Sequence, residues 1–329
     1  MELGIDLGTT TTVVSEARRG VLFEGPTVML VRRGGGRRDR VLAVGAEAAD
    51  LLGRAPSRFT PVRPLDDGGV TDLETARVYL RAVLHAAGQR PWRLPVRAVV
   101  TVPVGSSALE TRALIEAAEE AGIRPVTALD APIAGAVGCG VDPMERRVHL
   151  VVDVGGGTAE AVAFCYGGVL ASRTGRTGGE EMTLAVARWL REEHQLHVGD
   201  LEVEALKVRV GSDGDGPLVV QGRDGIAGRP RLATVRAAEV AEAVRPVTDQ
   251  VVRTLAPVLD DLPPQALSDV MAEGVLVFGG GSLVPGLPQE LERALGLPVT
   301  TAAEPLTCVA EGAARALRNR PLLAAYGRR

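Results

Sequence analysis

Two aspartates, each near the end of an apolar run, are the residues of this sequence best suited to chemistry. Asp153 lies in residues 151–158, where apolar residues surround it and three glycines and a threonine follow. Asp6 lies in a similar stretch, residues 3–12, where a glycine and four threonines follow. An apolar run that stops at glycines predicts a buried strand that enters a tight turn. Backbone amides in such a turn can approach phosphate oxygens, and the aspartate can hold a divalent cation through water; alternatively, each aspartate only caps its turn.

The two stretches predict a duplicated fold. Each is a hairpin, and the two lie about half a chain apart, which favours two similar domains with phosphates held between them. Each half then continues into alternating helices and strands, and a third glycine-rich turn, residues 279–282, follows the apolar run 274–278. We therefore predict an α/β protein with two lobes around a cleft and with ligands at the carboxyl ends of the strands. The Gly/Arg-rich residues 32–40 are expected to form a solvated loop.

Composition excludes several classes of protein. The chain has 329 residues, of which 46% are hydrophobic and 3% aromatic, so a large core must consist mainly of Val, Leu, Ile and Ala. The net charge of −4 argues against a nucleic-acid-binding role. No apolar run reaches the roughly 18 residues that span a membrane, and Met1 leads almost directly into the first strand without a signal peptide. Cys139, Cys165 and Cys308 are isolated, as expected for buried, reduced thiols of a cytosolic protein.

Three motifs, in this order, carry a resemblance to a known family. Residues 5–9 (IDLGT), 152–158 (VDVGGGT) and 277–282 (VFGGGS) resemble the phosphate-1, phosphate-2 and adenosine motifs of the actin/DnaK/sugar-kinase ATPase superfamily. Within it, the chain is most similar to the bacterial actins of the MreB/Mbl family. Characteristic segments of that family resemble residues 63–70, 102–106, 119–122, 177–180 and 304–310. The resemblance covers essentially the whole chain, whereas the glycine clusters by themselves could also be ordinary structural turns.

The resemblance implies an actin-like ATPase fold, in which two duplicated ribonuclease-H-like domains surround a nucleotide cleft. Lobe I would comprise residues 1–135 and 308–329, with a small subdomain at about 31–62. Lobe II would comprise residues 136–307, with a small subdomain at about 181–240. The implied function is an ATP-dependent homopolymer filament in the cytoplasm. The filament would lie peripherally on the inner face of the cell membrane and guide wall synthesis with cell-wall elongation proteins, during elongation or sporulation.

The resemblance also assigns roles by position. The cofactors would be ATP or ADP and Mg²⁺, with Mg²⁺ organised through water by Asp6 and Asp153. Glu204 and Lys207, one helical turn apart, match the pair that reaches the ribose and adenine, although such pairs are also common on solvated helix faces. The other implied phosphate- and nucleoside-binding residues are Thr9, Thr10, Thr11, Gly155, Gly156, Gly157, Thr158, Gly280, Gly281 and Ser282.

One departure from the family concerns catalysis. The family reads Ile-Glu-Glu-Pro where residues 129–132 of this chain read Leu-Asp-Ala-Pro, and the second Glu of the family positions the attacking water. Ala131 has no acceptor at that place, so hydrolysis is expected to be slow. The candidate catalytic residues are Asp130, Thr158 and Asp153; the alternative for Asp130 is that it only caps the following helix.

Residues 89–95 predict a membrane contact. Proteins of the MreB/Mbl family, which this chain resembles, contact the membrane through an N-terminal amphipathic helix or a hydrophobic loop in this region. This chain is expected to begin directly with a strand, which leaves the loop. Trp92 and Leu94 are therefore predicted to insert into the interface while Arg90 and Arg93 contact anionic lipid. The alternative is a tryptophan packed within its loop.

Several function classes stay open at this point. The chain is either an ATPase whose turnover times filament disassembly, or a nucleotide-binding switch or scaffold with little turnover. A DnaK-type chaperone ATPase module is a third class, and the lack of room for a substrate-binding domain argues against it. A sugar kinase is a fourth, but it needs a catalytic Asp aimed at a sugar hydroxyl, and none is clearly placed.

Overall fold

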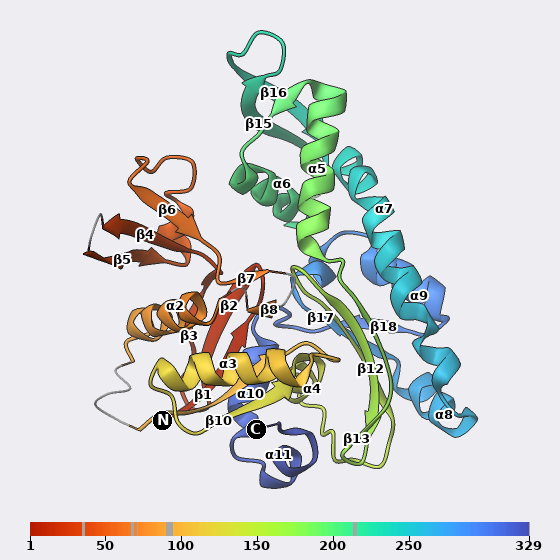
Figure 1. Ribbon diagram of the computed structural model, residues 1–329. Helices are drawn as coiled ribbons and strands as arrows, with labels where there is room; N and C mark the ends of the chain where they lie inside the picture. Colours follow the sequence, from red (N-terminus) through yellow and green to blue (C-terminus); the bar gives the residue numbers. More distant parts are fainter. Residues whose placement is uncertain (35–36, 67–68, 71, 90–94, 213–215, 329) are drawn as a thin grey trace.

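The structure is a computed structural model that describes residues 1–34, 37–66, 69–70, 72–89, 95–212 and 216–328. Two five-stranded sheets dominate it, one from each half of the chain (Figure 1). Within these residues, no helix is both long enough and apolar enough to cross a membrane.

The first sheet has the strand order β10-β9-β1-β2-β3, with β1 antiparallel to β2 and parallel to β9. Helix α2 (Leu73–Ala86) buries Tyr79 and Leu80 in one core cluster with Leu3 and Ile5 of β1. The strands and the second covering helix are β1 (Glu2–Leu7), β2 (Thr11–Glu16), β3 (Gly20–Pro26), β9 (Arg97–Val102), β10 (Val126–Asp130) and α3 (Ala108–Glu120).

The second sheet repeats this arrangement. Its order is β13-β12-β11-β17-β18, with β11 antiparallel to β12 and parallel to β17. The duplicated α/β fold predicted from the two hairpins is therefore confirmed. Its elements are β11 (His149–Val154), β12 (Ala159–Cys165), β13 (Gly168–Gly175), β17 (Val275–Phe278), β18 (Val299–Thr301), α5 (Gly179–His194), α6 (Asp200–Ser212), α7 (Ala237–Leu255), η1 (Ala256–Asp261), α8 (Pro264–Glu273), η2 (Gly280–Leu283) and α9 (Leu287–Leu295).

A three-stranded sheet extends each half away from the centre, β5-β4-β6 in the first and β14-β15-β16 in the second, whereas the two-stranded sheet β7-β8 lies near the centre (Figure 1). The prediction of a loop at residues 32–40 was wrong: most of this stretch belongs to an antiparallel pair of strands, β4 and β5, whose apolar ends anchor the polar part of the hairpin. The elements are β4 (Met29–Gly34), β5 (Arg37–Val44), α1 (Ala46–Ala49), β6 (Phe59–Val62), β7 (Leu65–Asp66), β8 (Gly69–Val70), β14 (Leu196–His197), β15 (Pro217–Asp224) and β16 (Pro230–Arg236).

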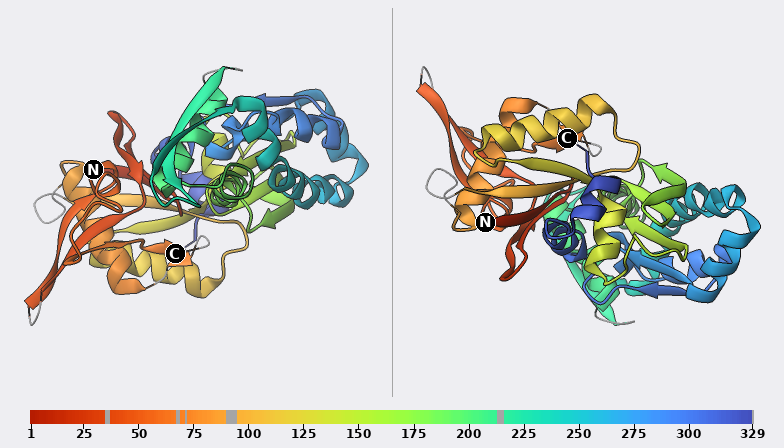
Figure 2. Two further views of the ribbon diagram at one scale, coloured as in Figure 1. Left: turned by 90° about the horizontal axis from the view of Figure 1, so that it is seen from above. Right: turned by 90° about the horizontal axis from the view of Figure 1, so that it is seen from below.

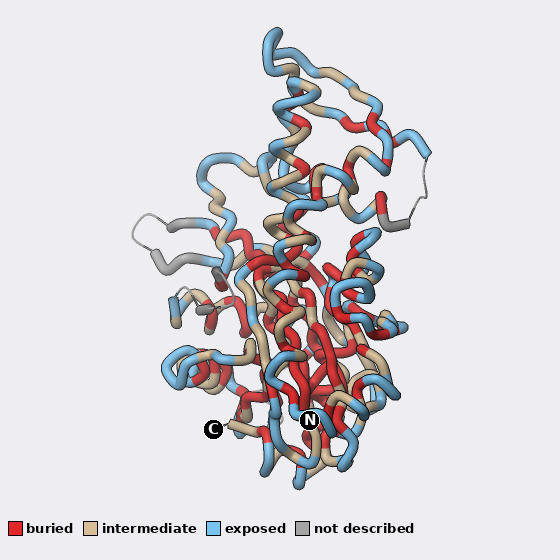
Figure 3. Tube along the Cα trace, turned by 90° about the vertical axis from the view of Figure 1, so that its right-hand side faces the viewer, coloured by how far each residue is buried: buried red, intermediate tan, exposed pale blue. Residues whose placement is uncertain are grey.

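Two helices join the halves at the base of the molecule, α4 (Ala131–Gly138) and α10 (Cys308–Ala316), followed by α11 (Arg320–Tyr326) (Figure 2). They are in close contact: a methyl group added at Gly312 would lie 1.8 Å from the carbonyl oxygen of Ala134. One buried cluster combines side chains of both sheets with these helices, including Val99, Val151 and Phe278. Figure 3 shows that burial concentrates in the strands of this central region.

The cysteines fit the prediction of buried, reduced thiols only in part, because two of the three are not buried. All three are free of disulfides. Cys308 is buried, as expected, whereas Cys139 and Cys165 are partly exposed.

Candidate functional site

The turns of the two hairpins have the same backbone geometry. The amide of Gly8 donates to the carbonyl of Thr11 at 3.1 Å, and the amide of Gly155 donates to the carbonyl of Thr158 at 2.8 Å. The strands leave both turns in the same register, with Leu7 paired to Thr12 and Val154 to Ala159. Each turn therefore presents its two central residues at the carboxyl end of a central strand, where α/β proteins bind ligands.

The central residues of the two turns face one another. A methyl group added at Gly156 would lie 2.0 Å from the hydroxyl oxygen of Thr10, and one at Gly157 would lie 2.8 Å from that of Thr9. Glycines in one turn thus make room for threonines of the other. The Thr10 hydroxyl is buried and, within the described residues, has no hydrogen-bond partner.

A pocket of about 490 Å³ opens at this junction, which is within the usual size range of small-molecule sites. Thirteen of the predicted site residues line it, from both halves of the chain. They are Asp6, Thr9, Thr10, Thr11, Asp153, Gly155, Gly156, Gly157, Thr158, Glu204, Lys207, Gly280 and Gly281. Two do not line it, Asp130 and Ser282.

The two aspartates form a half-buried acidic pair below the turns. Asp6 accepts a hydrogen bond from the Thr101 hydroxyl at 2.6 Å. Burial raises the pKa of Asp6, and burial together with the negative charge of Asp6 raises the pKa of Asp153 to about 8. The described residues contain no group of three or more acidic, histidine or cysteine side chains that could by themselves enclose a metal ion. A cation here would therefore take most of its ligands from water and a bound anion.

The first residues of helix α5 are hydrogen-bonded to the second turn, residues 155–158. The amides of Gly179 and Glu180 donate to the carbonyls of Gly155 and Gly156 at 3.0 and 2.8 Å. These bonds fix the helix N-terminus beside the pocket, and the positive end of the helix dipole favours an anion there.

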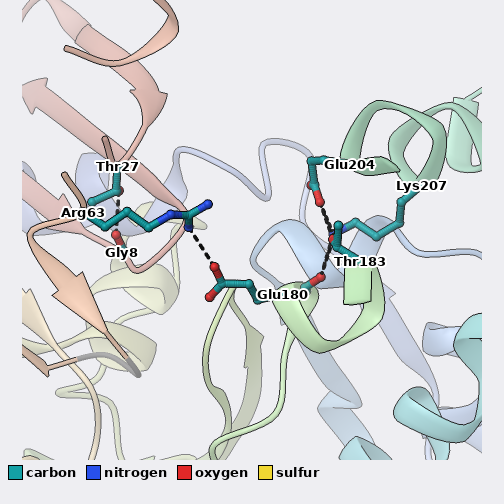
Figure 4. Close-up of polar contacts among 8 residues, drawn as sticks. Gly8, Thr27, Arg63, Glu180, Thr183, Glu204 and Lys207 are labelled. Atoms are coloured by element: carbon teal, nitrogen blue, oxygen red, sulfur yellow. Dashed lines mark hydrogen bonds and ion pairs between the residues drawn. The ribbon is translucent and has the colours of Figure 1, made fainter. Parts of the chain in front are cut away.

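Lys207 of α6 is fully used in holding α5 against α6 (Figure 4). Its ammonium group donates to the Gly179 carbonyl at 2.8 Å and to the Thr183 hydroxyl at 2.9 Å, and lies 2.8 Å from a Glu204 carboxylate oxygen. An ammonium group has three protons, so these three acceptors satisfy it. Glu204 also accepts a hydrogen bond from Thr183; its side chain is 37% exposed, and the residue lines the pocket. The interpretation of this pair as a solvated helix face therefore does not hold for Lys207.

Apolar side chains line the other end of the pocket. Val208, Leu283 and Leu306 line it and are 59%, 48% and 42% exposed, so a flat ring could cover them. Gly279 has a φ of +82°, which favours glycine, and any β-carbon there would lie 2.4 Å from an Asp153 carboxylate oxygen. Ser282 is buried, and its hydroxyl donates to the Gly279 carbonyl at 2.6 Å, so it supports the turn from behind.

Asp130 does not line the pocket. Its carboxylate pairs with Arg328, which the backbone pairing of Ala128 with Arg328 brings alongside β10. Asp130 occupies the N-cap position of α4 but makes no side-chain cap bond, so the capping interpretation was wrong. Ala131 does line the pocket, with a methyl group.

Sequence reasoning missed Glu160, which also lines the pocket. It is 1% exposed, and its carboxylate accepts the backbone amide of Val104 at 2.7 Å. A signal was present, because Glu160 is the single charged residue in the otherwise apolar run 159–165 that follows the glycine turn. The predicted membrane residues, Trp92 and Leu94, lie outside the described part of the chain.

Comparisons with known proteins agree with this architecture. The pattern of the MreB/Mbl protein family matches residues 1–324. The chain is 34% identical over 322 residues to the cell shape-determining protein MreB of Escherichia coli K12, covering 96% of this chain and 93% of the relative. It is 30% identical over 322 residues to the cell shape-determining protein Mbl of Bacillus subtilis 168, covering 97% and 96%.

Solved structures show the same fold. MreB5 of Spiroplasma citri bound to AMPPNP matches with a TM-score of 0.87 at 24% identity, covering 96% of both chains. The MamK double helical filament matches with a TM-score of 0.77 at 22% identity, covering 96% of this chain and 98% of that one. The fold is therefore actin-like, and the match of the family pattern over nearly all residues shows that the chain belongs to the MreB/Mbl family.

Proposed function

We propose that this protein is a nucleotide-dependent, filament-forming cell-shape protein that binds Mg-ATP or Mg-ADP between two lobes. The observation that carries the proposal is the pair of facing turns, with a buried Thr10 hydroxyl between them that has no hydrogen-bond partner among the described residues. Buried polar groups are nearly always hydrogen-bonded, and a phosphate oxygen in the pocket would supply the missing partner. Relatives named MreB and Mbl determine cell shape, and the fold matches MreB5 bound to AMPPNP and to ADP.

The residues present fit a triphosphate. The amides of Gly155, Gly156 and Gly157 and the hydroxyls of Thr9, Thr10, Thr11 and Thr158 would contact the phosphate chain. Asp6 and Asp153 would hold Mg²⁺ through water, because a divalent cation relieves the repulsion that raises the pKa of Asp153. When bound, Mg²⁺ neutralises phosphate charge.

The nucleoside would occupy the other end of the pocket. Glu204 has free surface for a ribose hydroxyl, while Lys207 holds Glu204 in position. Gly280 and Gly281 leave room for the base over Val208, and Ser282 supports their turn from behind. Direct titration with a fluorescent ADP analogue, with and without Mg²⁺, tests this arrangement. Failure of the wild-type chain to bind ATP or ADP would refute the proposed function.

We further propose that hydrolysis is slow. Thr158 and Asp153 line the pocket, whereas Asp130 pairs with Arg328 and Ala131 offers no acceptor for water. A switch or scaffold that binds nucleotide without turnover is the second candidate, and Ala131 is the observation that favours it. Ala131→Glu is expected to raise phosphate release severalfold above wild type. An unchanged rate in this variant would show that Ala131 does not limit turnover.

Assembly is the second half of the proposal. The chain is expected to form homopolymer filaments with ATP, as fits its likeness to MamK in its double helical filament. Sedimentation and negative-stain microscopy with ATP, with ADP and without nucleotide test this expectation. Absence of filaments under every condition would contradict it.

The proposed location is the cytoplasm, on the inner face of the cell membrane, beside cell-wall elongation proteins. Trp92 and Leu94 are the proposed lipid contacts, with lobe I formed by residues 1–135 and 308–329 and lobe II by 136–307. Co-sedimentation with anionic vesicles is expected to fall when both side chains are replaced by alanine. Unchanged binding of the double variant would rule out this contact.

A further inference from the structure

The two hairpins differ at the position paired with the aspartate. In the first, Asp6 lies opposite Val13; in the second, Asp153 lies opposite Glu160. Directly paired residues of antiparallel strands point to the same face of the sheet. Both Val13 and Glu160 accordingly line the pocket, one with an apolar group and the other with a carboxylate.

The carboxylate of Glu160 is energetically unfavourable at this position. It is 1% exposed, and no Arg, Lys or His of the described part of the chain lies within ion-pair distance of it. Its contacts are the Val104 amide, at 2.7 Å, and the Thr174 hydroxyl. Burial of a carboxylate without a cation is unfavourable, and valine fills the equivalent place in the first hairpin. The fold does not require a carboxylate here, so its retention points to work in the pocket.

The other carboxylates at or near the pocket have different tasks. Asp6 is bonded to Thr101 and paired with Asp153 in the proposed magnesium site. Glu204 is held at the far end by Thr183 and Lys207. Asp130 is turned to Arg328. Glu160 is the carboxylate on the strand that leaves the phosphate turn at Thr158, and its bond to Val104 fixes it between β12 and the end of β9.

We propose that Glu160 orients the water that attacks the terminal phosphate of bound ATP, in place of the carboxylate that is missing at Ala131. This inference rests on the proposed function. The water oxygen bonds to the terminal phosphorus while the bond from that phosphorus to the bridging oxygen breaks. The electron pair leaves with ADP, and the proton released by the water passes to an oxygen of the new phosphate. Glu160 accepts a hydrogen bond from the water and keeps a lone pair of the water directed at phosphorus.

The test compares Glu160→Gln with the wild-type full-length chain in Mg-ATP. The glutamine keeps a side-chain oxygen for the Val104 amide, so ATP affinity, measured by competition with a fluorescent nucleotide, is expected to stay within about threefold. Phosphate release at saturating ATP is expected to fall at least about tenfold, since the amide is a much weaker acceptor for the water. Glu193→Gln, which alters an exposed carboxylate on α5, is the matched control and is expected to match wild type.

The outcomes separate this inference from the proposed function. If Glu160→Gln binds ATP and releases phosphate at the wild-type rate, the inference about Glu160 is overturned, because a purely structural role of Glu160 predicts that result. Loss of release in Asp130→Asn but not in Glu160→Gln also overturns it. If Glu160→Gln does not fold, Glu160→Asp, which withdraws the carboxylate by one methylene, must show the same loss of release with ATP still bound. Wild-type protein that binds ATP and releases no phosphate refutes this inference alone, whereas failure to bind ATP refutes the proposed function.

Discussion

Hairpins β1–β2 and β11–β12 have the same backbone pairing but opposite side-chain chemistry at their turns. The first turn carries Thr9 and Thr10 where the second carries Gly156 and Gly157. Because each glycine faces a threonine across the junction, the two turns approach closely only in this combination. Duplication thus supplies two identical backbone frames, and the difference between them creates an asymmetric site: one turn gives hydroxyls and the other gives space and amides.

The largest expected effect comes from the aspartate of the second hairpin. Asp153→Asn should weaken Mg-ADP binding about 10- to 100-fold, because it removes a carboxylate that organises the hydrated cation. The nucleotide-free variant should, in contrast, be more stable than wild type at pH 8. Asp153 has a pKa of about 8 in the folded chain and 3.8 ordinarily, so the folded chain keeps a proton that the unfolded chain loses. Wild-type stability therefore falls as pH rises through this window, and asparagine removes the fall. Thermal denaturation at pH 4 and pH 8 measures it.

Asp6→Asn tests whether the aspartate of the first hairpin affects stability less than the aspartate of the second. Burial raises the pKa of Asp6, but the Thr101 hydroxyl opposes that rise, so the stability gain at pH 8 should be smaller than for Asp153→Asn.

Wild-type affinity for Mg-ADP should also increase as pH rises toward about 8, because binding requires the ionised Asp153. An affinity that does not change between pH 6 and pH 8 would show that Asp153 is not titrating at the site.

A further prediction tests the fit between the two turns. Gly156→Ala should weaken nucleotide binding about tenfold, because the new methyl group would meet the Thr10 side chain at 2.0–2.6 Å. Thr10→Gly in the same chain should restore part of the loss, with a coupling of about 1 kcal/mol in a double-mutant cycle. Gly155→Ala is the matched control, since its nearest neighbour would lie 3.3 Å away, at the Thr158 carbonyl. Equal losses for the two alanine variants would contradict the proposed complementarity.

Another prediction concerns the Thr10 hydroxyl of the first turn, which has no partner among the described residues. Thr10→Val removes a buried donor that has no partner in the described structure, so nucleotide-free stability should rise by up to about 1 kcal/mol while affinity for ADP falls about five- to tenfold. Thr12→Val is the control, because the Thr12 hydroxyl is bonded to Thr27 at 2.8 Å and accepts from Tyr79 at 3.0 Å. The control should lose stability on chemical denaturation. A loss of stability in both variants would show that Thr10 is satisfied in the folded protein.

Much of this asymmetric site follows from local sequence. An apolar run, an aspartate and a glycine turn specify a strand end without reference to distant residues, so Asp6, Asp153 and the turns could be placed together from the duplication alone. The structure brings Glu204 and Lys207 to the same pocket, but the tasks of Lys207 depend on Gly179 and Thr183 of another helix. No helix periodicity reveals those acceptors.

The rest depended on contacts between distant parts of the chain. Asp130 was assigned to catalysis or to a cap because its neighbours in sequence suggest both, yet its partner, Arg328, is 198 residues away. Glu160 has a local signal, an acid in an apolar strand, but only the register of β11 with β12 shows that it points to the side of Asp153. Pairing register and chain ends are tertiary properties, and single positions do not encode them.

The smallest expected effect lies where the two halves meet outside the turns. Arg63, just after β6, forms an ion pair of 2.7 Å with Glu180 at the start of α5 (Figure 4). The side chains are 50% and 35% exposed, and such pairs contribute less than about 1 kcal/mol. Arg63→Ala should therefore speed ADP release no more than about two- to fourfold, and high salt should cancel the difference. Glu180→Ala should speed ADP release to the same extent. The double variant should release ADP no faster than either single variant, because both changes remove the same ion pair. Stopped-flow displacement of a fluorescent ADP measures the rates, and additive effects would mean that the two side chains act separately.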